Sequence, residues 1–84
     1  MENIKNCIVT LKNGKSYFVI EEVTDNFDVY NLVLNVEDES DVRIVMQEVI
    51  NGKVVLSDVK DLLNISYLKG RFRTKIEEAR EGLR

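Results

Sequence analysis

Asn13 and Gly14 form the turn signal that most constrains how this chain folds. An Asn-Gly pair between two apolar runs favours a two-residue type I′ hairpin, because both central residues of that turn need a positive φ. If these two residues are the whole loop, Lys12 faces Lys15 and every other cross-strand pair is fixed. One face of the hairpin then carries Cys7, Val9, Leu11, Phe18 and Ile20. The opposite face carries Ile4, Ile8, Tyr17, Val19 and Val23.

Three further strands follow, separated by turn residues. After a turn at residues 24–26, residues 29–36 alternate with the period of two that marks a half-buried strand. The acidic loop 37–41 leads to a fourth strand over residues 42–49. A second Asn-Gly pair, at Asn51 and Gly52, turns the chain into a fifth strand at residues 54–57. The length of that last loop is ambiguous, so its register stays open.

The last third of the chain has helical periodicity. Asp58 or Asp61 can cap a helix, because a carboxylate accepts hydrogen bonds from the free N–H groups of the first turn. Apolar residues then recur at spacings of three or four, at Leu62, Ile65, Leu68, Phe72, Ile76, Ala79 and Leu83. Gly70 costs about 1 kcal/mol relative to Ala inside a helix. Two alternatives therefore stay open, one continuous helix or two helices near 59–69 and 71–83.

These elements predict a single α+β domain over residues 1–84. Its parts are an antiparallel five-stranded β-meander at 1–57 and a C-terminal helical segment at 58–84, packed on one face of the sheet. One helix cannot cover both faces of the first hairpin, so the face marked by Ile8, Tyr17 and Val19 needs other cover. Either the sheet curls on itself or a second chain packs there. These three residues are therefore a candidate protein-binding surface, with a homodimer as one use of it.

The sequence offers little material for catalysis. Histidine is absent and Cys7 is the only cysteine, which excludes the usual zinc sites and any Ser-His or Cys-His pair. We therefore expect no catalytic residue, no metal, no cofactor and no enzymatic activity. In the expected register Cys7 lies among apolar neighbours, which predicts a buried and unreactive thiol.

The same composition carries an expectation about location. No apolar run approaches the roughly 20 residues of a membrane span, and the first residues lack a signal-peptide pattern. A single cysteine is also unusual for a small secreted domain. We expect a cytoplasmic protein with no membrane partner.

Charge is unevenly distributed along the chain. The net charge is −3, yet residues 1–61 hold twice as many acids as bases and residues 62–84 twice as many bases as acids. The acidic loop lacks the glycine and the final glutamate of an EF-hand, so a solvated turn is favoured over a calcium site. An acidic surface could also imitate nucleic-acid phosphates and occupy a basic groove of another protein. The candidate residues are Glu21, Glu22, Asp25, Asp28, Glu37, Asp38, Glu39 and Asp41.

A basic cluster in the helical segment supports an alternative. Lys69, Arg71, Arg73 and Lys75 surround Phe72, so the cations could contact phosphates while the ring stacks on a base. A purely structural role is favoured for this cluster, with Phe72 in the apolar stripe of the helix and the cations on its solvent-exposed side. A pI of 4.9 also argues against a broad nucleic-acid interface.

The strand and turn pattern of residues 13–23, 29–36 and 41–61 resembles that of small β-meander-plus-helix proteins from low-GC Gram-positive bacteria and their phages. The resemblance covers most of the chain and consists of patterning. It implies a fold and a genomic setting, and no activity. The leading hypothesis is a non-enzymatic protein-interaction module, with inhibition of a host nuclease or immune effector, in the manner of an anti-CRISPR protein, as a narrower guess. The alternative is a nucleic-acid-associated regulator that uses the basic helix.

Overall fold

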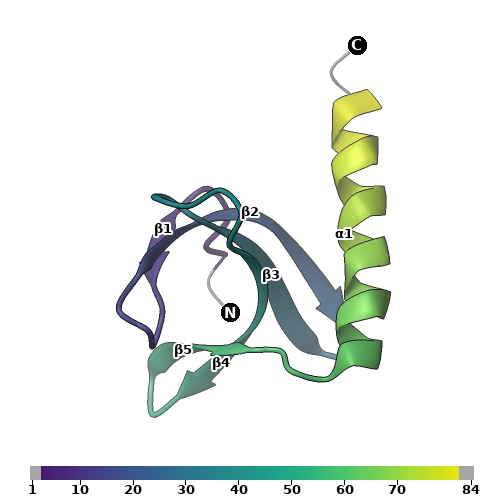
Figure 1. The fold of residues 1–84 in the computed structure, drawn as a ribbon. Coiled ribbons are helices and arrows are strands. Elements are labelled where there is room, and N and C mark those ends of the chain that lie inside the picture. Colours follow the sequence, from purple (N-terminus) through teal and green to yellow (C-terminus); the bar gives the residue numbers. More distant parts are fainter. Residues whose placement is uncertain (1–2, 82–84) are drawn as a thin grey trace.

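A computed structural model describes residues 3–81 and confirms the α+β fold. Its elements are β1 (Ile8–Thr10), β2 (Ser16–Asp25), β3 (Asp28–Asn35), β4 (Val42–Ile50), β5 (Lys53–Asp58) and α1 (Leu62–Glu81). The five strands are antiparallel and lie in the sheet in sequence order. Figure 1 shows the sheet rolled up on itself, with α1 standing along one side.

The first hairpin differs from its predicted register by one residue. Val9 faces Tyr17 and Ile8 faces Phe18, whereas a two-residue loop requires Val9 to face Phe18. The loop has three residues, because the Leu11 N–H donates to the Lys15 carbonyl at 3.0 Å and the Gly14 N–H donates to the Leu11 carbonyl at 2.9 Å. Of its residues only Gly14 has a positive φ, +81°. This is the pattern of a type I turn closed by a glycine bulge, which a sequence with Asn-Gly also permits.

The corrected register places Val9 and Leu11 on the inner face beside Tyr17 and Val19, and Ile8 on the outer face beside Phe18. Tyr17 and Val19 are completely buried, so the predicted exposed face of Ile8, Tyr17 and Val19 is wrong for both of them, and Ile8 alone is exposed. Tyr17 and Val19 join an inner cluster with Leu11, Val33 and Val45, against which Ile4, Val9 and Leu56 pack. Of the two alternatives for covering this face, the structure shows the curled sheet. A β-bulge between Val19 and Glu21 gives β2 the bend that the curl needs.

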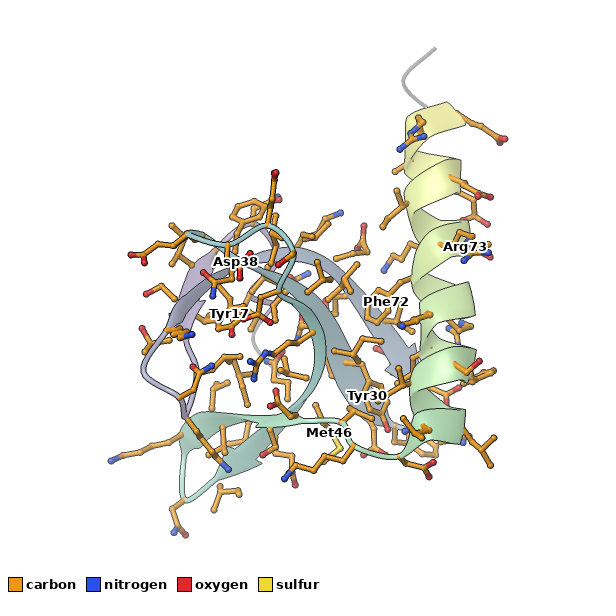
Figure 2. The ribbon with its side chains drawn as sticks, viewed as in Figure 1. Tyr17, Tyr30, Asp38, Met46, Phe72 and Arg73 are labelled. Carbon is orange, nitrogen blue, oxygen red and sulfur yellow. The ribbon has the colours of Figure 1, made fainter. Side chains whose placement is uncertain are left out.

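A second apolar cluster lies between the outer face of the sheet and α1. Val23, Tyr30 and Ile44 pack there against Leu68 and Phe72 of the helix. Figure 2 shows Phe72 pointing from α1 toward the sheet and Tyr30. The predicted helical stripe is therefore confirmed as the packing face from Ile65 to Phe72. Leu62 and Ala79 are exposed, Ile76 is half-buried and Leu83 lies outside the described residues.

Helix α1 begins at its predicted cap and runs through Gly70. The Asp61 carboxylate accepts a hydrogen bond from the Leu63 N–H at 3.0 Å, which satisfies a free donor of the first turn. The helix continues without a break to Glu81, so the two-helix alternative is excluded.

Cys7 is exposed, so the prediction of a buried thiol is wrong. It was derived from the two-residue hairpin register. In the structure Cys7 precedes β1, in a turn where its N–H donates to the Ile4 carbonyl and its own carbonyl accepts from the Val19 N–H.

Gly70 and Gly14 make a matched pair of glycines for testing this backbone. A Cβ added at either position meets no atom within 4 Å, but only Gly14 has a positive φ. Gly70→Ala should raise the free energy of unfolding by about 1 kcal/mol, because Ala gains helix propensity without a clash. Gly14→Ala should lower it by roughly the same amount, because an L residue is strained there. Denaturant titration of both variants measures the difference, and a destabilised Gly70→Ala variant would contradict a continuous α1.

Candidate functional site

The densest polar cluster of the described residues surrounds Asp41, at the end of the β3–β4 loop. Its carboxylate accepts hydrogen bonds from Arg43 Nε at 2.8 Å, Tyr17 Oη at 2.5 Å and Asn35 Nδ2 at 3.1 Å. Arg43 also donates to Asp58 at 3.1 Å, which ties β4 to the end of β5. The bonds from Arg43 and then from Tyr17 and Asn35 hold the pKa of Asp41 far below its ordinary value. A carboxylate held ionised in this way is a poor proton acceptor at neutral pH, and its bonds fix the β3–β4 loop against β2 and β4.

The acidic residues singled out from the sequence do not form one surface. Asp28 begins β3, whereas Glu37, Asp38 and Glu39 follow its other end. An eight-residue strand at about 3.3 Å per residue separates these two groups by roughly 23 Å. Asp41 is engaged in its own cluster, as described above.

The acids near α1 are largely neutralised within the chain. Glu21 is buried and pairs with Lys5 at 3.0 Å and with Lys75 at 3.5 Å. Burial raises the pKa of Glu21, but the Glu22 backbone N–H and Lys5 lower it by more, so the net shift is downward. Asp25 accepts hydrogen bonds from Tyr67 at 3.0 Å and Arg71 at 3.1 Å. The predicted acidic surface is thus divided between two ends of the sheet and partly cancelled.

The basic cluster is divided as well, between two flanks of α1. On the flank that faces β2, Arg71 binds Asp25 and the Thr24 carbonyl, and Lys75 binds Glu21 and the Glu22 carbonyl. Figure 2 places Arg73 on the solvent side of the helix. Phe72 is only 2% exposed, so its predicted role as a base-stacking ring is wrong. Phosphate binding by the cations stays a prediction.

The other flank of α1 borders an open trough, which we call the β4-flank trough. It consists of two adjoining grooves of about 530 and 360 Å³ that share Leu32, Val42 and Lys69. The first is also lined by Ile44, Val59, Lys60, Leu62 and Ile65 and by the ion pair of Arg43 and Asp58, and the second by Phe72, Arg73, Ile76, Glu77 and Arg80. At about 1.5 Å per helical residue, the stretch from Leu62 to Arg80 is roughly 27 Å long.

An apolar row on the outer face of the sheet continues from the trough. Register places Ile8, Phe18, Leu34 and Val42 directly beside one another across β1, β2, β3 and β4. Ile8 and Val42 are at least half exposed, and the Phe18 and Leu34 side chains are partly so. This row is the part of the outer face that α1 leaves uncovered.

The most unusual single residue is Phe27, at the tip of the β2–β3 hairpin. Its side chain is completely exposed and its φ is +71°, beside Asn26 at +49°. The β4–β5 turn has nearly the same angles at Asn51 and Gly52, and there the second position is a glycine. A bulky residue therefore occupies a backbone position that favours glycine, at a cost of roughly 1–2 kcal/mol.

Sequence reasoning missed Phe27, although a signal was present. The expected turn ended at residue 26, so the aromatic residue directly after Asp25 and Asn26 was left unassigned. An aromatic side chain between turn residues and the first alternating position of the next strand is the feature that points to it. Only the structure shows its positive φ and its full exposure.

Asp41→Asn tests the loop cluster through its pH dependence. The folded pKa of Asp41 lies below its unfolded value of 3.8. The carboxylate therefore contributes stability that is fully present above that value and is lost as the pH falls through the folded pKa. Asp41→Asn should be less stable than the natural protein near neutral pH, and the difference should shrink below about pH 4. Urea titrations across this range measure it. Asp28→Asn, an exposed control, should change little, and a pH-independent deficit for Asp41→Asn would contradict the ionised cluster.

Comparisons with known proteins provide no evidence on function, so the proposals below are argued from the structure. No family model, curated protein or solved structure matches the chain. The resemblance to proteins of Gram-positive bacteria and their phages therefore stays a prediction. Within residues 3–81, no helix combines the length and the apolar character that a membrane crossing requires. Over the same residues, no three His, Cys, Asp or Glu side chains gather closely enough to hold a metal ion.

Proposed function

We propose that this chain is a protein-binding module that inserts Phe27 into an apolar pocket of its partner. The observation that carries the proposal is a fully exposed aromatic side chain on a left-handed backbone. Phe27 lowers the stability of the free protein, and its exposed ring has nothing in the described chain to offset that cost. Burying the ring in a complex would contribute about 1.5–3 kcal/mol, enough to offset the strain.

The hairpin that carries Phe27 is held in place before any partner arrives. Asp25, two residues before it, is bonded to Tyr67 and Arg71 of α1. Asp25 also pairs with Asp28 across the turn, which keeps the loop to two residues. A preordered tip loses little conformational entropy on binding, and aromatic residues are frequent energetic centres of interfaces.

Charge next to the tip favours a partner with a basic surface. Asp28 is exposed directly beside Phe27, and Glu22 is half-buried three residue pairs farther along the same hairpin. Anionic lipid headgroups and nucleic-acid phosphates would be repelled by these carboxylates, whereas a basic groove on a protein would attract them. Within the proposal, a host nuclease or immune effector is the class of partner that best suits this chemistry.

Phe27→Gly should separate stability from binding. Removing the strained side chain should raise the free energy of unfolding by about 1 kcal/mol. It should also weaken capture of the partner by at least about tenfold, because the anchor is lost. Capture is measured by affinity purification from a lysate of the source cells, with quantitative mass spectrometry. A benzophenone amino acid at position 27 should cross-link the same protein.

Val54→Thr provides the matched control, since it trims a partly exposed apolar side chain on β5, away from the hairpin tip. This variant should capture the partner as the natural protein does. Equal recovery of the same proteins by Phe27→Gly and the natural chain would overturn the proposal, as would a Phe27→Gly variant that is less stable.

A further inference from the structure

We infer that the β4-flank trough is a second binding site, whose occupant is an acidic amphipathic helix of another protein. The inference does not depend on the role proposed for Phe27. That residue lies on the β2–β3 hairpin, which is bonded to α1 through Tyr67 and Arg71 on the opposite flank. Three features of the trough carry the inference, namely its shape, its apolar walls and its unpaired cations.

The trough has the shape of a helix-binding groove. One wall is the side of α1, and the other is the outer face of the sheet, where Leu32 of β3 and Val42 of β4 line it. Its length of roughly 27 Å equals about 18 helical residues. Helices commonly dock in such grooves by placing an apolar stripe on the floor.

The walls of the trough carry exposed apolar side chains. Val42 is 50% exposed on the sheet side, and Leu62 is 80% exposed at the beginning of α1. Ile76 is half-buried at the other end of the trough. The row of Ile8, Phe18, Leu34 and Val42 adjoins this surface through Val42. An amphipathic helix would cover these side chains without any change in the fold.

The cations along the trough determine which sign of charge the occupant should carry. Lys60, Lys69, Arg73 and Arg80 make no hydrogen bond or ion pair with any residue between positions 3 and 81. Two acids also line the trough: Asp58 is paired with Arg43, and Glu77 has no partner among residues 3–81. On the β2 flank, by contrast, Arg71 and Lys75 are both engaged by the sheet. A trough with an apolar floor and unpaired cations favours a helix that has carboxylates beside its apolar stripe.

The same cations argue against a second copy of this chain in the trough. A symmetric pair of α1 helices would bring Lys69, Arg73 and Arg80 of both copies close together, and like charges in contact are unfavourable. Nucleic acid is disfavoured because a phosphate backbone held by the cations would leave the apolar side chains of Val42, Leu62 and Ile76 uncovered, whereas an amphipathic helix would cover them.

A synthetic helical peptide tests the site with purified components. The probe is a fluorescent peptide of about 18 residues, with leucine on one helical face, glutamate beside it and alanine elsewhere. Fluorescence polarisation measures its affinity for the full chain. Arg73→Glu should weaken binding by at least about tenfold, while Lys53→Glu, with the same change in net charge on the β4–β5 hairpin, should change it less than about twofold. Phe27→Gly should bind the peptide normally, which separates this site from the hairpin tip.

A second peptide and a mass measurement exclude the other occupants. A peptide with lysine in place of glutamate should bind at least about tenfold more weakly, and the chain alone should have the mass of one copy. Equal binding of both peptides, equal effects of Arg73→Glu and Lys53→Glu, or no binding near 1 mM (about −4 kcal/mol) would overturn the inference. A two-chain mass that Arg73→Glu abolishes would assign the trough to a second copy and overturn it too. Displacement of the peptide by an oligonucleotide at low salt would assign the trough to nucleic acid and would also overturn the inference.

Discussion

Packing inside the curled sheet is the interaction on which the rest of this structure depends. Tyr17, Val19, Val33 and Val45 have no exposed surface, although each belongs to a strand of a single small sheet. The sheet buries these side chains by bending at the bulge in β2, so that its own strands cover its inner face. The Tyr17 hydroxyl completes the arrangement by donating to Asp41, which ties the buried ring to the β3–β4 loop. Because the sheet covers one face itself, α1 is needed only for the other.

The length of α1 then determines which surfaces stay open. The helix has twenty residues, yet among its described residues only Leu68 and Phe72 are fully buried. Its β2 flank is closed by ion pairs to the hairpin, whereas its β4 flank borders the trough and the uncovered apolar row. A helix so much longer than its buried contact leaves one flank available for a partner. The hairpin that it fixes on the other flank presents Phe27.

Sequence patterns predicted where the strands and the helix lie better than which face of each one is buried. Alternation placed the strands to within a few residues, and Asp61 with the apolar stripe placed the helix. The register of the first hairpin was wrong because Asn13-Gly14 fits both a two-residue and a three-residue loop, and only the three-residue loop lets Val9 and Leu11 pack beside Tyr17. Exposure of Cys7 follows from the turn that precedes β1, and division of the acidic surface follows from the length of β3; local pattern fixes neither. Phe27 was missed because propensity rules expect glycine at its backbone angles.

The orientation of the Tyr17 ring tests the account most directly, since both proposed surfaces depend on which face of β2 turns inward. A two-dimensional nuclear Overhauser spectrum of the folded chain reports which methyl groups lie near that ring. The curled sheet predicts cross-peaks from the Tyr17 ring to methyl groups of the inner cluster, which contains Leu11, Val33 and Val45. Cross-peaks to Ile8 in their place would put the ring on the outer face and contradict the account.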